Sequence, residues 1–490
     1  MRHTPDLIVD PQPRFDLSPH LFMQFMEPLG TTDGSVEAAW DFQRERWRED
    51  VIAATRELAP PLIRWGGILS SYYRWQEGVG PRHRRKPMHN LMWGGFETNQ
   101  VGTHEFVGFC RAVGAEPLIS INFESDGRRG WSHPPVGGVR SAGPREAAAW
   151  VSYCNNPDSA ARRANGALEP FAVRLWQIGN ETSYGKGGFD CETAARRTRA
   201  FARAMHRADP SIELIGWGDS GWAPRMIEVA GEHLKYVAIH HFFNSGLEDS
   251  PLHGSAWRRD PELTWRHLMH AHVSMEEKLS AARGQVAGSG VYLAMTEGHF
   301  ALPGRNRCEV LSTWAAGVAN ARILNVQQRH GDLLKIANLS DFCGTRWMVN
   351  SVMIPTPLHA GRAYLMPVAW VTALYRRHIG TRAVDVTSVP DGLDVVASRR
   401  GRRVFLHVVN TNLADPVRVK LRAVGERIVS GRAFEIAADP FDEIDEAAPE
   451  LFAPTERAVP ASGLWEFPAA SVSAVELQLD RSTSGEGRRR

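Results

Sequence analysis

The amino-acid sequence predicts an α/β fold: a (β/α)8 TIM barrel followed by a C-terminal antiparallel β-sandwich. Between about residues 20 and 350, eight short apolar runs alternate with longer segments of helical periodicity, as in parallel strands joined by helical crossovers. From about residue 380, short alternating runs separated by turn residues replace that pattern. A length of 490 residues also exceeds that of one ordinary domain.

The barrel strands are expected where apolar runs are followed by polar or glycine-containing loops. These runs are Leu21–Glu27, Leu62–Trp65, Glu116–Asn122, Val173–Ile178, Glu213–Trp217, Tyr236–His240, Val291–Thr296 and Leu334–Leu339. Helical periodicity between them predicts helices at Ala38–Leu58, Thr103–Val113, Ala147–Cys154, Glu192–Ala208, Thr264–Ala282 and Glu309–His330. An open doubly wound sheet is the alternative, but the chain carries no glycine fingerprint of a dinucleotide site, so the barrel is favoured.

The sandwich is expected from alternating segments near the C-terminus, and Leu7–Val9 is expected to add an early strand to it. The segments are Ala383–Ser388, Leu393–Ala397, Val404–Asn410, Val417–Leu421, Arg432–Ile436 and Val472–Leu479. We therefore expect a barrel over residues 19–365 and a sandwich formed by residues 1–18 and 366–480. The polar residues 481–490 are expected to be a disordered tail.

Composition excludes several classes of partner. The formal net charge of +2 gives no electrostatic reason to expect a nucleic-acid or membrane partner. The N-terminus lacks the apolar core of a signal peptide, and no run approaches membrane-spanning length. The five cysteines are scattered and lack CxxC spacing, which favours free thiols and a cytoplasmic location.

Two strand ends carry the chemistry that the sequence suggests. The run beginning at Phe171 ends in Gly179-Asn180-Glu181, and the run beginning at Val291 ends in Glu297. Catalytic groups of a barrel lie at the C-terminal ends of its strands, so the two carboxylates are expected to face one pocket. One can donate a proton to a leaving group while the other attacks an anomeric carbon, which is glycoside hydrolysis.

Other polar residues at predicted strand ends are candidates for substrate binding. They are Glu27, Arg64, Asn180, His240, His241 and His299. For several, a different role is open: Glu297 as a helix cap, or Glu27 as a structural ion-pair partner of Arg64. The histidines with Glu297 could imitate zinc ligands, but His240 and His241 are adjacent on a strand and should point to opposite faces. We therefore expect no metal.

At these residues the chain resembles the retaining α-L-arabinofuranosidases of glycoside hydrolase family 51, which belong to a barrel clan with catalytic glutamates on strands 4 and 7. The likeness covers nearly the whole chain. It includes Phe25–Gly30, Leu62–Gly67, Tyr73–Arg82, Gly102–Phe106, Gly114–Pro117, Trp150–Asn155 and Trp176–Glu181.

The resemblance implies roles for individual residues. It implies that Glu181 is the general acid/base, that Glu297 is the nucleophile and that Asn180 bonds the sugar 2-hydroxyl. It further implies that Glu27 and Arg64 hold the sugar ring or the nucleophile. The expected substrate is an oligosaccharide or other glycoside carrying a terminal furanosyl residue. No cofactor is expected, and the family implies a homo-oligomer.

The chain departs from the family pattern around the expected sugar site. Pro28, Ile68 and Phe242 stand where the family usually has polar contacts, and Gly298-His299 replaces an aromatic residue and its neighbour. Several such changes suggest a different glycone, such as D-arabinofuranose or galactofuranose. A loop longer than the family's follows Asn122, and its Arg128, Arg129 and Trp131 could line subsites or close as a lid; an inert surface insertion is the alternative.

Two other functions stay open. One is an endo-acting or transglycosylating relative, which depends on how open the cleft is. The other is a non-catalytic carbohydrate-binding barrel, which the presence of both glutamates and Asn180 disfavours, because binding alone needs neither an acid nor a nucleophile.

Overall fold

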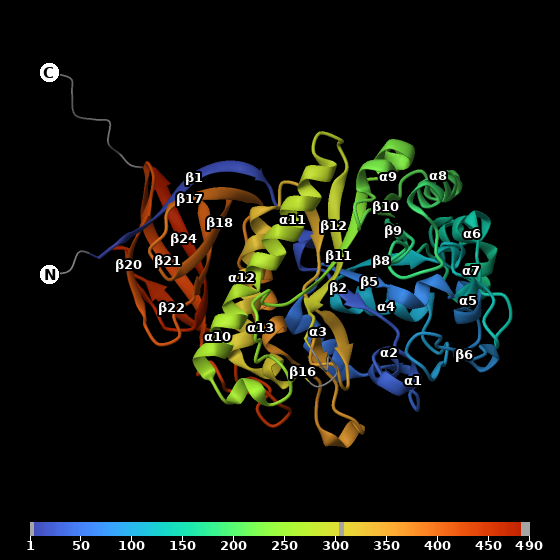
Figure 1. Ribbon diagram of the computed structural model, residues 1–490, viewed down its shortest axis with the longest axis horizontal. Coiled ribbons are helices and arrows are strands. Elements are labelled where there is room, and N and C mark those ends of the chain that lie inside the picture. The colour runs from blue at the N-terminus through green and yellow to red at the C-terminus, as the bar shows by residue number, and fades with distance from the viewer. Residues whose placement is uncertain (1–3, 303–307, 482–490) are drawn as a thin grey trace.

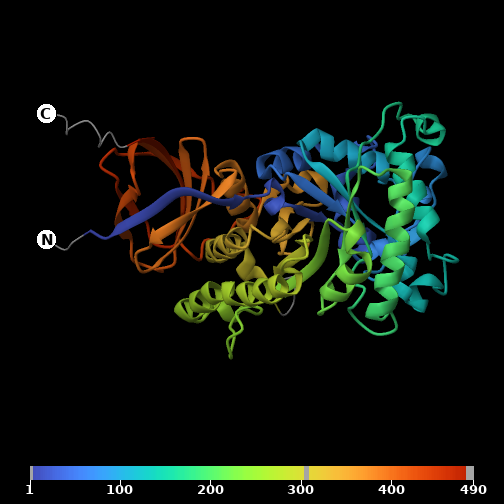
Figure 2. The same cartoon turned by 90° about the horizontal axis from the view of Figure 1, so that it is seen from above.

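The structure, a computed structural model, describes residues 4–302 and 308–481. Figure 1 shows two parts, with a β-sandwich at one end and a barrel surrounded by helices at the other. Seen from above, in Figure 2, strand β1 (Asp6–Asp16) runs across the sandwich toward the barrel. None of the helices in the described part of the chain combines the length and apolar character that crossing a lipid bilayer requires.

Eight parallel strands form the barrel. They are β2 (Gln24–Met26), β5 (Leu62–Trp65), β8 (Glu116–Ile121), β9 (Leu175–Ile178), β10 (Glu213–Trp217), β11 (Tyr236–Phe243), β12 (Tyr292–Phe300) and β13 (Leu334–Ala337). Each pairs in parallel with the next, and the ring closes where the Met23 N–H donates to the Ala337 carbonyl at 2.9 Å. The predicted barrel is confirmed, and the open doubly wound sheet is excluded.

Helices cover the barrel. The longer ones are α3 (Glu49–Leu58), α4 (Thr103–Val113), α6 (Pro144–Asn155), α8 (Cys191–Ala208), α9 (Ala223–Ala230), α10 (Pro261–His270), α11 (His272–Val286), α12 (Trp314–Arg329) and α13 (Pro367–Arg377). Helix α8 illustrates their origin: Asp190 caps its N-terminus by accepting the Thr193 N–H, and Ala194, Thr198, Phe201 and Met205 bury one face.

Short elements fill the connections. The one-turn α-helices are α1 (Gly30–Asp33), α2 (Val36–Ala39), α5 (Arg129–Ser132) and α7 (Ala160–Ala164). The 3-10 helices are η1 (Pro19–Phe22), η2 (Gly67–Ser71), η3 (Trp75–Gly78), η4 (Arg82–Arg84), η5 (Glu124–Gly127), η6 (Gly231–His233), η7 (Ala256–Arg258), η8 (Glu309–Ser312) and η9 (Leu358–Ala360). The short strands are β3 (Trp40–Asp41), β4 (Arg46–Trp47), β6 (Met88–His89), β7 (Phe96–Glu97), β14 (Asp341–Gly344), β15 (Asn350–Met353) and β16 (Tyr364–Leu365).

The predicted helix Ala38–Leu58 is wrong in its first half. Strands β3 and β4 form a hairpin there, in which the Trp40 and Trp47 rings meet edge to face with centroids 5.5 Å apart. The Asp41 side chain accepts the backbone N–H groups of Gln43 and Arg44, which favours a turn over a helix. A tertiary aromatic contact and a local turn therefore outweigh helical periodicity.

The C-terminal part is the predicted antiparallel β-sandwich. Its strands are β1, β17 (Arg382–Ser388), β18 (Leu393–Arg400), β19 (Arg403–Asn410), β20 (Val417–Ala423), β21 (Glu426–Ala437), β22 (Thr455–Val459), β23 (Leu464–Phe467) and β24 (Ser471–Arg481). Leu7 and Val9 of β1 are fully buried in its core. Strands β22 and β23 were not predicted. Of the predicted tail, residues 482–490 lie outside the described residues, and Arg481 is the last residue of β24.

Candidate active site

Glu181 stands just beyond barrel strand β9. The strand ends at Ile178, and Gly179 turns the chain with a φ of +80°, which only glycine adopts readily. Glu181 itself has a φ of +49°, a conformation that costs free energy for a residue with a side chain. Its side chain is about four-fifths buried. The loop therefore holds this carboxylate in a strained position beside the barrel axis.

Glu297 lies within β12, which continues past it to Phe300. The register between β11 and β12 shifts between Ile239 and His240, so that Thr296 is an extra residue and His240 stands opposite Glu297. Bulges of this kind redirect side chains and are frequent next to active sites. Here the bulge places an imidazole beside a carboxylate.

The two glutamates meet at His240. One carboxylate oxygen of each glutamate and a ring nitrogen of His240 all lie within 4.8 Å of one another. His240 Nδ1 is 3.1 Å from Glu181 Oε1 and 3.6 Å from Glu297 Oε2. Burial lowers the pKa of His240 to about 4, so the ring is neutral at neutral pH. With Nδ1 facing carboxylates, Nδ1 carries the hydrogen and Nε2 accepts from the Thr296 hydroxyl at 3.0 Å.

Arg64 connects the nucleophile candidate to Asn180. Its Nη1 donates to Glu297 Oε1 at 2.8 Å and its Nη2 donates to Asn180 Oδ1 at 2.5 Å. The Asn180 amide nitrogen is buried and has no hydrogen-bond partner among the described residues. An unsatisfied buried donor next to two carboxylates is suited to a substrate hydroxyl.

Glu27 has a different environment from the one expected of an ion-pair partner. Its Oε1 accepts the backbone N–H of Ile68 at 2.9 Å, and within the described ranges no ion pair joins it to Arg64. Burial raises the pKa of Glu27 well above its usual value, and the nearby carboxylates of Glu297 and Asp341 raise it further. The protonated form is therefore favoured.

The pKa of the Glu297 carboxyl is shifted in opposite directions by its surroundings. Burial raises its pKa, and the Glu181 carboxylate acts in the same direction, whereas His240 and the Arg64 guanidinium lower it. Because His240 is neutral at neutral pH, the Arg64 guanidinium is the cation that favours an ionised Glu297 carboxylate there.

A cavity of about 120 Å³ opens between these groups. Its lining residues are Phe25, Glu27, Ile68, Met92, Trp93, Glu181, Phe242, Glu297, His299 and Asp341. The structure therefore brings the predicted residues Glu27, Glu181, Glu297 and His299 to one hollow. Asp341 was missed because it follows the eighth barrel strand on β14, beyond the predicted strand ends.

Met92 and Trp93 were missed because they lie on the β6–β7 hairpin, where the sequence shows no strand-end motif. Ile68 and Phe242, which the family comparison placed around the expected sugar site, line the cavity. Phe25 was left unassigned, because an apolar residue is indistinguishable from a core residue without the fold.

Five predicted binding residues are not among those that line the cavity. Arg64, Asn180 and His240 make the contacts around the glutamates described above, whereas His241 and Trp131 make other contacts. His241 Nε2 is 3.0 Å from Ser274 Oγ, on the opposite face of β11 from His240, as the alternation along a strand requires. Trp131 lies under the Arg128 guanidinium, whose carbon is 4.2 Å from the ring centroid. Its ring centroid is also 6.1 Å from that of Tyr72.

Glu181, His240 and Glu297 are also the residues that could approach a metal ion together. Tetrahedral zinc places its ligand atoms about 3.3 Å apart, closer than the 4.8 Å spread of this group. The Arg64 guanidinium already occupies one Glu297 oxygen. The arrangement fits a pair of carboxylates with a hydrogen-bonding histidine better than a metal centre.

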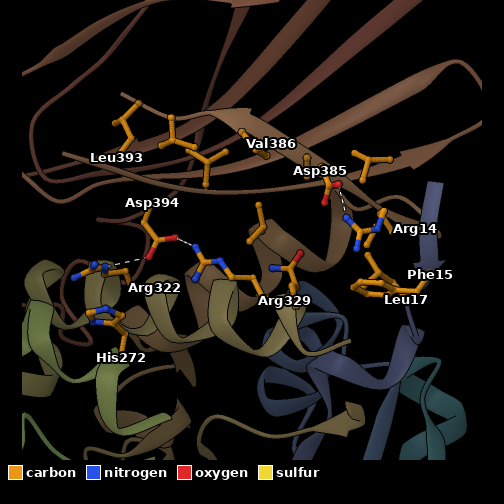
Figure 3. Close-up of a pocket in the computed structure, with 17 residues that line it drawn as sticks. Arg14, Phe15, Leu17, His272, Arg322, Arg329, Asp385, Val386, Leu393 and Asp394 are labelled. Atoms are coloured by element: carbon orange, nitrogen blue, oxygen red, sulfur yellow. Dashed lines mark hydrogen bonds and ion pairs between the residues drawn. The ribbon is translucent and has the colours of Figure 1, made fainter. Parts of the chain in front are cut away.

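A larger cavity of about 660 Å³ lies elsewhere, between the sandwich and helix α12. Figure 3 shows Asp394 of β18 directed at Arg322 and Arg329 of α12, and Asp385 directed at Arg14. Its charged groups are thus paired with one another. Because it contains neither glutamate, volume alone does not identify the reactive site.

Comparison with known proteins agrees with the geometry. Residues 54–251 match the family model described as the alpha-L-arabinofuranosidase 1 domain. Alpha-L-arabinofuranosidase C of Emericella nidulans is 34% identical over 232 residues, which are 45% of this chain and 43% of that protein. Intracellular exo-alpha-(1->5)-L-arabinofuranosidase of Acetivibrio thermocellus is 30% identical over 253 residues, 48% of this chain and 47% of that protein. The chain thus spans less than half the length of each of these relatives.

Solved structures extend the likeness in fold to almost the whole chain. The alpha-L-arabinofuranosidase from Thermotoga maritima superposes with a TM-score of 0.78 at 24% identity, covering 96% of this chain and 99% of that one. The GH51 alpha-L-arabinofuranosidase from Thermotoga petrophila RKU-1 gives the same TM-score and identity, covering 96% of this chain and 100% of that one. The chain is therefore similar in sequence to alpha-L-arabinofuranosidases over residues 54–251, and in fold to solved GH51 alpha-L-arabinofuranosidases over nearly its full length.

Proposed function

We propose that this protein is a retaining, exo-acting glycoside hydrolase that removes terminal furanosyl residues, in the manner of an α-L-arabinofuranosidase. The observation that carries the proposal is the approach of Glu181 and Glu297 to within 4.8 Å around His240. Retaining glycosidases hold their carboxyl groups about 5–5.5 Å apart, whereas inverting enzymes need about 6.5–9.5 Å to admit a water molecule. The short separation supports double displacement.

In the first step, a Glu297 oxygen attacks the anomeric carbon while Glu181 donates its proton to the departing glycosidic oxygen. The bond to the leaving group breaks, an alcohol departs and a glycosyl ester forms on Glu297. The Arg64 guanidinium, 2.8 Å from Glu297, keeps the attacking oxygen ionised before this step. His240 Nδ1–H donates to Glu181 Oε1 and leaves the second Glu181 oxygen to carry the proton.

In the second step, Glu181 accepts a proton from a water molecule, whose oxygen attacks the anomeric carbon. The ester bond breaks and Glu297 is released as a carboxylate, so the two inversions give net retention. The Asn180 amide nitrogen, buried and without a described partner, is placed to donate to the sugar 2-hydroxyl in both steps.

The small cavity supports exo action, because a volume of about 120 Å³ suits one terminal sugar and not a stretch of polysaccharide. Its lining gives the glycone few polar partners besides the carboxylates, His299 and Asp341. We therefore keep a glycone other than L-arabinofuranose, such as D-arabinofuranose or galactofuranose, as the second candidate.

Organisation and location are part of the same proposal. Two relatives are named as intracellular enzymes, and all five cysteines are free thiols, which supports a cytoplasmic enzyme. We propose residues 19–365 as the catalytic barrel and residues 1–18 with 366–480 as the sandwich, with helix α13 at the start of the second range packed against α12 and α3 of the barrel. A homo-oligomer that acts on glycosides, with no nucleic-acid or membrane partner, completes the proposal.

The test is hydrolysis of nitrophenyl α-L-arabinofuranoside, with the anomer of the first product followed by NMR. The wild-type protein should release the α-anomer, and Glu297→Gln should lose at least about 1,000-fold in kcat/KM. Glu181→Gln should lose a comparable factor on an arabinofuranosyl disaccharide, whose alcohol leaving group requires the proton. Glu232→Gln, at an exposed carboxylate remote from the cavity, is the matched control. Release of the β-anomer would exclude retention.

A panel of other nitrophenyl furanosides and pyranosides separates the remaining candidates. Turnover of one of these in preference to the arabinofuranoside would establish the altered glycone. Absence of turnover on every member, with sugar binding retained, would instead establish a non-catalytic binding protein.

A further inference from the structure

The segment after barrel strand β8 has an unusual backbone. Glu124, Ser125 and Asp126 have φ values of +50°, +54° and +52°, and Gly127 follows at +76°. A residue with a side chain costs about 1–3 kcal/mol in this conformation, so three in succession must be held by their surroundings. Strain of this kind gathers at functional sites.

Asp126 is completely buried and joins two barrel loops. Its Oδ2 accepts the Ser71 hydroxyl at 2.5 Å, in the loop after β5. Its Oδ1 accepts the Thr182 hydroxyl at 2.6 Å and the Asn180 backbone N–H at 3.3 Å. Thr182 and Asn180 are the two neighbours of Glu181 in the chain. The carboxylate thus restrains both sides of Glu181 without touching its side chain.

Arg128 restrains the backbone of Glu181 itself. Its Nη2 donates to the Glu181 carbonyl at 2.8 Å and also to the Tyr184 carbonyl. The Trp131 ring lies against the same guanidinium and limits its movement. Because Glu181 has a positive φ, its carbonyl is turned out of the ordinary strand direction and needs a donor to stabilise it.

We propose that Asp126 and Arg128 are positioning residues that orient the Glu181 carboxyl toward the departing glycosidic oxygen. The inference rests on the proposed role of Glu181 as general acid/base. Proton transfer depends steeply on geometry, and a displacement of about 1 Å can cost about 100-fold in rate. The start of the insertion after β8 then holds the loop that carries Glu181 in place. This role differs from that of a lid and from that of an inert surface loop.

Leaving-group dependence provides the test. A dinitrophenolate departs with little protonation, whereas a sugar alcohol requires the proton from Glu181. Asp126→Asn should lower kcat/KM for an arabinofuranosyl disaccharide about 100-fold, yet lower it less than about fivefold for the dinitrophenyl arabinofuranoside. Glu181→Gln should show the same pattern more strongly and serves as the reference.

Two milder variants guard against a folding defect. Thr182→Val keeps the side-chain shape and removes one hydrogen bond to Asp126, and Arg128→Lys keeps the charge and removes the pair of carbonyl contacts. Both should show the same selective loss, with thermal midpoints near that of the wild type. His133→Gln, an exposed change in the same insertion, should leave both substrates unaffected.

Equal loss on both substrates, or no loss on either, would overturn the positioning role while leaving Glu181 as the acid/base. If the wild-type protein turned over neither substrate, the proposed function would fail and this inference with it. The two failures are therefore distinguishable.

Discussion

Arg64 and Glu297 form an ion pair 2.8 Å long, in which the arginine side chain is fully buried and the glutamate nearly so. The two residues come from barrel strands on different sides of the cavity, β5 and β12. Burial alone would favour a protonated Glu297, and a protonated carboxyl is a poor nucleophile. The guanidinium is therefore central to the proposed chemistry.

Arg64→Gln should raise the pKa of Glu297, because the neighbouring positive charge is lost while the burial remains. A nearby opposite charge typically lowers a carboxyl pKa by about 1–3 units, so the acid limb of the kcat/KM profile should move up by a similar amount. The measurement is the pH dependence of kcat/KM on a nitrophenyl furanoside.

Arg162→Gln is the matched control for this variant, because Arg162 is equally buried but donates only to backbone carbonyls, among them those of Tyr153 and Asn156. It should lower the thermal midpoint without moving the acid limb. An unmoved limb in Arg64→Gln would contradict the role assigned to that residue.

Asn180→Ala should lose the contact to the sugar 2-hydroxyl. Removing one hydrogen bond of this kind costs about 1–3 kcal/mol, which is about 5- to 150-fold in kcat/KM. The check is a double cycle that combines the variant with a 2-deoxy substrate. If the amide bonds that hydroxyl, the variant and the wild type should hydrolyse the 2-deoxy glycoside at similar rates. If the loss from the variant and the loss from the 2-deoxy substrate were independent and additive, Asn180 would act on something other than the 2-hydroxyl.

Asp341→Ala should weaken glycone binding, because Asp341 lines the cavity and the proposed mechanism gives it no part in bond breaking. Contacts made equally in the ground and transition states change KM and not kcat, so KM should rise about tenfold with kcat nearly constant. Asp341→Asn keeps one acceptor oxygen and should be intermediate. Asp332→Asn, at a carboxylate paired with Arg283 outside the cavity, is the control. A fall in kcat alone would show that Asp341 acts on the reacting atoms.

Acid should destabilise the fold through a buried histidine, His407. Burial lowers its pKa to about 3, from 6.5 in a solvated chain. The unfolded chain therefore takes up a proton first as the pH falls. The contribution of neutral His407 to the free energy of unfolding is complete above about pH 6.5 and is lost progressively toward pH 3. Between pH 7 and pH 4.5 the loss is about 2.5 kcal/mol.

His407→Gln removes this titration and keeps a side-chain amide whose N–H groups can donate to Gln328 Oε1 and the His378 carbonyl. The thermal midpoint of the variant should fall less between pH 7 and pH 4.5 than that of the wild type. Equal falls would assign the acid sensitivity to other groups, such as His240 and His241, whose pKa values are each lowered to about 4.

Sequence patterns predict the barrel well because each strand is a continuous apolar run with a clear end. Leu62–Trp65 and Glu213–Trp217 are strands over the predicted residues. Prediction fails where tertiary contacts decide the local structure. The hairpin at Trp40 and Trp47 replaces a predicted helix, and β11 and β12 continue beyond their polar residues because each pairs with the other.

Some residues of the candidate site can likewise be recognised in the sequence, and others cannot. Glu181 and Glu297 are recognisable because they end or interrupt apolar runs, and the barrel brings such positions together. Asp126 and Trp93 carry no comparable signal, since each acts through contacts with segments remote in the chain. That His240 and not His241 lies between the glutamates depends on a one-residue bulge, which sequence alone does not reveal.

Strand β1 has a consequence for how the molecule is made. It pairs with β17 on one side and β20 on the other, antiparallel to the first and parallel to the second. During synthesis this strand leaves the ribosome before the whole barrel, yet its neighbours emerge after it. Until then its edges stay open to wrong partners. A fragment of residues 366–481 expressed alone would lack the strand between β17 and β20. Adding the β1 peptide in trans should restore that strand.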